Sequence, residues 1–119
     1  MRRLPAVVLA ACLATAAALA ADAAPSGTYD SGGVTLSLST DGRYSVSQGG
    51  GTAVEGSYRI DGDTIMFTDE SGPYACTNAH PPGGTYSWKI EETALTLKRV
   101  SDACEERATD LTAHVWQKK

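Results

Sequence analysis

A short motif, Gly-x-Tyr, recurs three times along the chain and constrains its fold more than any other feature. The copies occupy residues 27–29, 56–58 and 84–86, so they begin 29 and 28 residues apart. After each copy come a turn and a second run in which apolar and polar residues alternate. A repeat of this length is one supersecondary unit, here strand, turn and strand. We therefore expect a chain of consecutive antiparallel hairpins.

Turn residues and alternating side chains support the same fold class. Asp41-Gly42 and Asp61-Gly62 separate alternating runs, and Asp-Gly supplies the positive φ angles of tight hairpins. Period-two alternation is typical of strands with one face on a core and the other in water. The sequence predicts an all-β fold, an antiparallel up-and-down meander of six or seven strands. Closing the meander into a small barrel would remove its exposed edges.

One segment near the C-terminus has helical spacing instead. Within residues 101–112, Asp102 and Glu105 resemble a helix-capping pair, and the apolar residues that follow are spaced three or four apart. The pattern predicts one short helix held to the barrel by Cys104, followed by a last strand through residues 114–116. We assign Arg107 and Trp116 to structure, with the guanidinium stacked on the indole at one end of the barrel.

The N-terminus has the composition of a secretory signal peptide. Two arginines precede a long apolar stretch rich in Ala and Leu, and small residues follow at signal-peptidase spacing. We expect residues 1–23 to be removed and residues 24–119 to form one domain. A retained membrane anchor is the first alternative. Lipidation at Cys12, which ends a lipobox-like Leu-Ala-Ala-Cys, is the second, and either would suit a passive envelope component.

Charge and cysteine usage describe the mature domain further. Cleavage would leave a net charge of about −5, which offers no attraction to phosphate backbones or anionic lipid. Nucleic acid and, after cleavage, membranes are therefore not expected partners. Cys76 and Cys104 would remain, and in a secreted or periplasmic compartment they most simply form a disulfide worth roughly 3 kcal/mol. A free thiol pair and half of a metal site are the alternatives, but the zinc-ligand spacing is missing.

The repeated order of Gly-x-Tyr strand, Asp-Gly turn and apolar strand resembles the lipocalin-like barrels of the calycin superfamily. The third copy with its tail, from Gly-Thr-Tyr-Ser-Trp at 84–88 to Trp116, resembles small secreted bacterial members of that group. The resemblance covers the mature chain, although Gly-x-Tyr stands where a lipocalin usually has Gly-x-Trp. It implies a barrel that binds a small molecule. We expect no cofactor.

No catalytic or metal-binding constellation emerges from the sequence. Nucleophile motifs and a convergent acid/base pair are missing, and we interpret the adjacent pair Asp69-Glu70 as solvent-exposed. We therefore expect a non-enzyme. The first hypothesis is a barrel that binds a small apolar ligand, with inward aromatic side chains as the candidate contacts: Tyr44, Tyr58, Tyr86 and Trp88. The alternative is that the same side chains fill the barrel as core and leave no room for a guest.

The second hypothesis is a protein-binding module, for instance an inhibitor of an exported hydrolase. A stretch rich in Pro and Gly, residues 73–84, would present an exposed loop tied down by Cys76. Binding residues often lie on loops that a rigid scaffold positions. The candidates for contact with a partner protein are Tyr74, Asn78 and His80.

Overall fold

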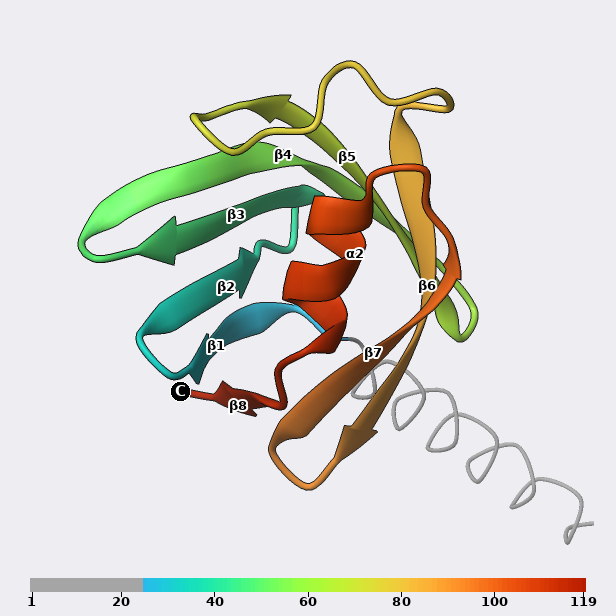
Figure 1. Ribbon diagram of the computed structural model, residues 1–119. Coiled ribbons are helices and arrows are strands. Elements are labelled where there is room, and N and C mark those ends of the chain that lie inside the picture. Colours follow the sequence, from blue (N-terminus) through green and yellow to red (C-terminus); the bar gives the residue numbers. More distant parts are fainter. Residues whose placement is uncertain (1–24) are drawn as a thin grey trace, which may run out of the picture.

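Residues 25–119 form an eight-stranded antiparallel barrel with one short helix, as expected, with seven strands before the helix and a last strand after it. The computed structural model describes residues 25–119, so the predicted signal peptide lies outside the described part. Each strand pairs with its sequence neighbours, and β1 closes the barrel by pairing with β8 (Figure 1). The strands are β1 Gly27–Ser31, β2 Val34–Leu38, β3 Arg43–Gln48, β4 Gly51–Asp61, β5 Thr64–Ser71, β6 Gly83–Glu91, β7 Ala94–Ser101 and β8 Trp116–Lys118.

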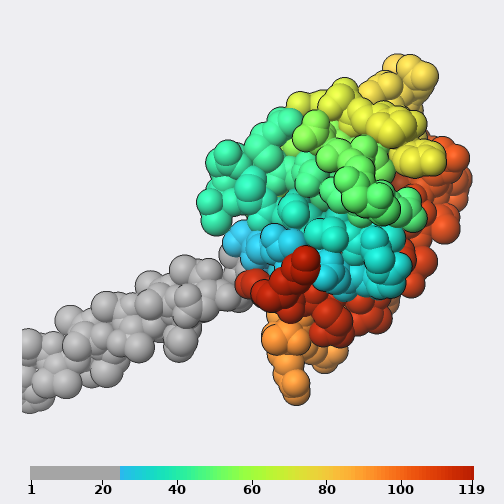
Figure 2. Space-filling model, turned by 90° about the vertical axis from the view of Figure 1, so that its left-hand side faces the viewer, coloured from blue at the N-terminus to red at the C-terminus, as the bar shows by residue number. Residues whose placement is uncertain are grey.

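The two Asp-Gly sequences form the predicted hairpin turns. Gly42 has φ +88° between β2 and β3, and Gly62 has φ +64° between β4 and β5. Glycine reaches this left-handed region without the steric cost of a Cβ atom. An up-and-down meander places alternate connections at opposite ends of the barrel. In Figure 2 the β5–β6 connection (yellow to gold) accordingly projects from one end and the β6–β7 hairpin (orange) from the other.

Two glycines of the repeated motif allow neighbouring parts of the barrel to approach closely. A Cβ on Gly56 would collide with the carbonyl oxygen of Thr68 on β5 and with the ring of Tyr44. A Cβ on Gly84 would overlap the carboxylate of Asp102. The second and third copies of the motif therefore make room for side chains that matter at one end of the barrel.

The barrel's own side chains fill much of its interior. The largest of those less than 2% exposed are Trp116, Tyr29, Tyr86, Phe67, Leu36, Leu38, Ile65, Leu95 and Pro25. Phe67 lies edge-on to Tyr44 and Tyr86, with ring centroids 4.8 and 5.8 Å away. An interior of eight strands is just wide enough for such packing. Any ligand space must therefore lie at an end of the barrel.

The helix α2, Glu105–Thr112, lies across one end of the barrel and packs against β7 (Figure 1). Its N-cap is Cys104, not Asp102 as the capping pattern predicted. Asp102 instead accepts the backbone N–H of Cys104 at 2.9 Å and lies buried beneath the helix. Leu111 and Ala108 form the buried face of α2. Within residues 25–119, no helix has the length and apolar character needed to cross a bilayer.

Candidate functional site

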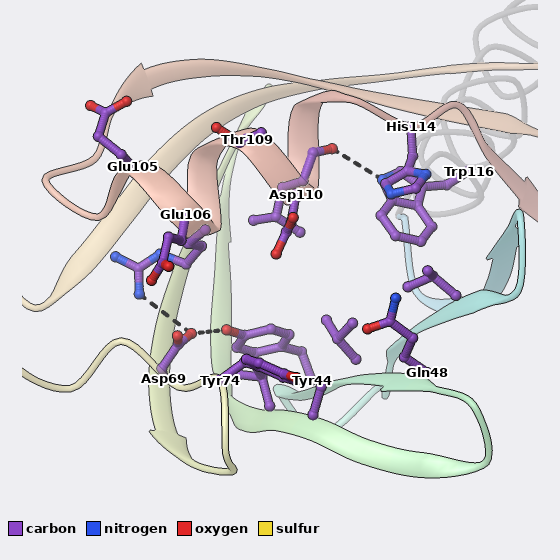
Figure 3. Close-up of a pocket in the computed structure, with 16 residues that line it drawn as sticks. Tyr44, Gln48, Asp69, Tyr74, Glu105, Glu106, Thr109, Asp110, His114 and Trp116 are labelled. Atoms are coloured by element: carbon purple, nitrogen blue, oxygen red, sulfur yellow. Dashed lines mark hydrogen bonds and ion pairs between the residues drawn. The ribbon is translucent and has the colours of Figure 1, made fainter.

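A cavity of about 470 Å³ lies between α2 and the strands β2 to β5 (Figure 3). The barrel supplies most of the apolar part of its wall, and α2 with the residues after it supplies most of the charged part. It opens at the same end as the β5–β6 connection, which contributes Tyr74. The lining residues are Val34, Tyr44, Val46, Gln48, Ala53, Val54, Asp69, Tyr74, Glu105, Glu106, Arg107, Thr109, Asp110, Leu111, His114 and Trp116.

A buried ion cluster centred on Arg107 borders this cavity. The guanidinium binds Asp102 with two hydrogen bonds, Nε to Oδ2 at 2.7 Å and Nη2 to Oδ1 at 2.6 Å. Its Nη1 lies 3.3 Å from Oδ1 of Asp69, which completes a second ion pair. The three side chains are only 5%, 0% and 2% exposed, in the order Arg107, Asp102, Asp69. Buried charges are tolerated only when they are paired and hydrogen-bonded in this way.

Two tyrosine hydroxyls satisfy the remaining acceptors of the cluster. Tyr44 donates to Asp69, and Tyr86 donates to Asp102. Burial, together with these hydrogen bonds to carboxylates, raises the pKa of both phenols well above the ordinary value. Burial alone would raise the pKa of Asp102, but hydrogen bonds from Arg107 and Tyr86 hold it below its usual range. At neutral pH the two phenols are therefore kept protonated and the Asp102 carboxylate is kept ionised.

The predicted disulfide between Cys76 and Cys104 is confirmed, and it belongs to the same cluster. Asp69 accepts the backbone N–H of Cys76 at 2.7 Å, as Asp102 does for Cys104. Each carboxylate thus holds one end of the bridge while it pairs with Arg107. Disulfide, helix and barrel meet at one point, because the cluster takes side chains from β3, β5, β6 and α2.

Arg107 and Trp116 are buried, but they do not form the stack expected from the sequence. The guanidinium faces carboxylates, while the Trp116 indole donates to the carbonyl of Leu111 at 3.1 Å and has His114 as its aromatic neighbour. Arg107 lies in the first turn of α2, whereas Trp116 follows the helix and contacts its C-terminal end through Leu111. Arg107 also lines the cavity, so it belongs to the candidate site as well as to the frame.

The four aromatic residues predicted for ligand contact do not gather in one place. Tyr44 lines the cavity. Tyr86 is fully buried in the ion cluster and lies behind the cavity wall. Tyr58 and Trp88 lie at the opposite end, where they donate to the carbonyls of Ser39 and Gly62 at 2.5 and 3.2 Å. Of the four, Tyr44 alone is in place to touch a ligand in this cavity.

The predicted partner-binding loop divides in a similar way. Tyr74 is 73% exposed and lines the cavity mouth. Its backbone N–H donates to Ala53 at 3.0 Å, which fixes this part of the loop to β4. Asn78 and His80 are exposed further along and do not line the cavity. The loop is therefore anchored near Tyr74 and projects beyond it.

Sequence reasoning missed several residues of the site, above all Asp69. The interpretation of Asp69 as solvent-exposed is wrong, since it is 7% exposed and paired with Arg107. The alternation that places Ile65 and Phe67 inside continues to position 69, so the pattern itself indicated an inward side chain. The helical residues Glu106 and Asp110 were missed because nothing in the sequence shows which face of a short helix will border a cavity.

One further polar pair lies near the site. His114 Nδ1 lies 3.0 Å from Oγ of Ser31, but no hydrogen bond among residues 25–119 gives the other ring nitrogen a carboxylate partner. A Ser–His pair without an orienting group lacks the arrangement of an activated nucleophile. In the described part of the chain, no three His, Cys, Asp or Glu side chains are grouped to hold a metal ion.

Comparisons of the chain with protein-family models, with curated proteins and with solved structures gave no significant match.

Proposed function

We propose that this protein is an exported, lipocalin-like barrel that binds a small apolar ligand in the cavity beneath α2, without catalysis. The cavity carries the proposal. Its volume of about 470 Å³ lies within the range of small-molecule sites, which are mostly apolar with a few polar groups. The rest of the barrel is filled by its own side chains, so this is the place where a guest would fit.

The wall is suited to an apolar body. Val34, Val46 and Val54 come from three neighbouring strands and are only partly buried, so their methyl groups border the open space. Leu111 from α2 and Trp116 from β8 face them across the cavity. Covering such surface with a ligand would be worth about 25 cal/mol per Å² removed from water.

A cavity-filling variant tests this proposal. Val54→Phe adds a ring where a ligand would lie, and Val100→Phe, which changes a residue 59% exposed outside the cavity, is the matched control. Decanol, a neutral apolar probe, is titrated into each protein by calorimetry. We expect one saturable site in the parent and in the control, and at least tenfold weaker binding in Val54→Phe. Equal binding by all three proteins would refute the proposed site.

The proposal of export rests on the N-terminal sequence and agrees with the disulfide in the domain. The N-terminal segment has the composition of a signal peptide, and a disulfide between Cys76 and Cys104 is typical of proteins from oxidising compartments. Membership of the calycin superfamily rests on the repeated motif together with the closed eight-stranded meander. The mass of the protein recovered from a secreting host tests export, because cleavage removes about the first 23 residues.

Binding to a protein partner is the second candidate function, and the exposure of Tyr74 favours it. A tyrosine that is 73% exposed on a loop anchored by a disulfide is the kind of rigid aromatic side chain that interfaces use. Pull-down from the exported proteins of the host, with Tyr74→Ala as control, tests this function. A partner retained by the parent and lost by Tyr74→Ala would favour it over ligand binding.

A further inference from the structure

The charges around the cavity select among apolar ligands. We propose that the cavity takes a cationic amphiphile, with the apolar tail inside and an ammonium group at the mouth between α2 and Tyr74. This inference rests on the proposed function, because it names the ligand class of the same site. It stands on the charges of the lining residues and on the aromatic side chains beside them.

Two carboxylates at the mouth are without an ion-pair partner in the described part of the chain. Glu106 and Asp110 lie one turn apart on α2 and point toward the cavity in Figure 3. Within residues 25–119 neither has a Lys, Arg or His nitrogen within 4.0 Å, whereas Glu105, which points away, is paired with Arg99 at 2.5 Å. A cation bound at the mouth would lie close to both free carboxylates.

The position of Asp110 runs against the stability of the helix, whereas Glu106 lies in the first turn, where the helix dipole favours a carboxylate. Like charges at i and i+4 repel each other, and a carboxylate in the last turn is opposed by the helix dipole. The last turn of α2 contains no basic residue that would offset this. Helix stability therefore explains Glu106 but does not explain a second carboxylate at Asp110 beside it, while a cationic ligand close to both does.

Arg107, the one arginine or lysine in the cavity wall, does not offer a site for an anion. Two carboxylates, Asp69 and Asp102, already pair with its single charge. Nη1 has no hydrogen-bond partner among the described residues, but its exposed surface is below 1 Å². A ligand carboxylate could not reach it without displacing Asp69. The cluster, with one positive and two negative charges, therefore repels a fatty-acid head group.

Aromatic side chains favour a cation independently of the carboxylates. Tyr44, Tyr74 and Trp116 all line the cavity, and in Figure 3 the two tyrosines lie across from Glu106 and Asp110. Ammonium groups bind over aromatic faces, and quaternary ammonium sites in proteins are built from such rings. Tyrosines opposite free carboxylates form the wall that an alkylammonium head group needs.

Three probes with the same alkyl tail test the inference: decyltrimethylammonium, decanol and decanoate, each titrated calorimetrically below its micelle concentration at neutral pH and low salt. We expect the cation to bind about tenfold tighter than decanol and decanoate to bind weaker than both. The two carboxylates attract the ammonium group and repel the carboxylate, and water between the charges keeps each effect moderate. Added salt should reduce the differences.

A charge-removing variant locates the effect. Glu106→Gln/Asp110→Asn should abolish the preference for the cation and leave decanol binding unchanged. Asp61→Asn/Asp63→Asn, which removes the same charge at the exposed β4–β5 turn, should keep the preference. Decanol binding with no preference for the cation, or a preference that survives Glu106→Gln/Asp110→Asn, would overturn this inference and leave the proposed function standing. Binding of none of the three probes would overturn both.

Discussion

Replacing Arg107 by Met would remove the one cation that holds the buried cluster together. Methionine has nearly the length of the arginine stem, so the change removes the charge while keeping most of the packing. Asp69 and Asp102, 2% and 0% exposed, would be left without a counter-ion. Breaking a buried ion pair from one side costs about 3–5 kcal/mol. In a domain of this size that corresponds to a melting temperature lower by roughly 15 °C or more.

The loss should depend on pH in a way that a packing defect would not. In the variant, a stranded carboxylate gains by taking up a proton, so its pKa in the folded state rises above the unfolded value. Stability gained from such a proton is present at low pH and is lost as pH rises. The deficit relative to the parent should therefore shrink by about 1 kcal/mol per pH unit from pH 7 to pH 5.

Urea unfolding followed by circular dichroism at several pH values measures this deficit. Arg43→Met is the control, because the ion pair of Arg43 with Glu70 is about half exposed and should contribute less than about 1 kcal/mol. Adding Asp69→Asn to Arg107→Met removes one stranded charge and should recover more than 1 kcal/mol relative to additivity. A deficit below 1 kcal/mol, or one that does not change with pH, would refute the assigned role of the cluster.

Three further predictions concern the same end of the barrel. Reducing the disulfide should lower the free energy of unfolding by about 3–4 kcal/mol, seen in urea titrations with and without reductant; an unchanged midpoint would contradict this. Gly84→Ala should cost about 1–3 kcal/mol in thermal unfolding because its Cβ overlaps Asp102, whereas Gly51→Ala, with open space around it, should cost less than about 0.5 kcal/mol; equal losses would show that the overlap is relieved. The raised pKa values of Tyr44 and Tyr86 show that folding favours the protonated phenols. Their contribution to the free energy of unfolding is therefore complete below pH 10 and is lost as pH rises above it. Urea midpoints at pH 8, 10 and 11 check this, and a smaller fall above pH 10 in Tyr44→Phe is expected.

The sequence predicted the barrel well because its information there is local. Alternation, Asp-Gly turns and the Gly-x-Tyr repeat each report on neighbouring residues, and the closed meander follows from them. The seven strands before the helix agree with the expected six or seven, and the last strand, β8, begins at Trp116, at the end of the segment predicted to be a strand. The bridge between Cys76 and Cys104 followed from there being only two cysteines after the predicted signal peptide.

The site was harder to predict because it depends on contacts between distant elements. Asp69 and Arg107 are 38 positions apart, and nothing near either residue names the other as partner. The aromatic candidates were chosen by their face on a strand, but height along the barrel decides which of them meets the cavity. Tyr44 lies at the helix end and Tyr58 at the other, although both alternate inward. Which face of α2 points toward the cavity depends on how the helix packs against the barrel.

The most direct test of the proposed ligand site is the methyl NMR spectrum of the protein during titration with decanol. Methyl groups of Val34, Val46, Val54 and Leu111 line the cavity, while those of Ile65 and Leu97 lie in the filled part of the barrel. Saturable shifts in the first group, with Ile65 and Leu97 unchanged, are the predicted result. No saturable shift, or shifts spread equally over both groups, would contradict a ligand site beneath α2.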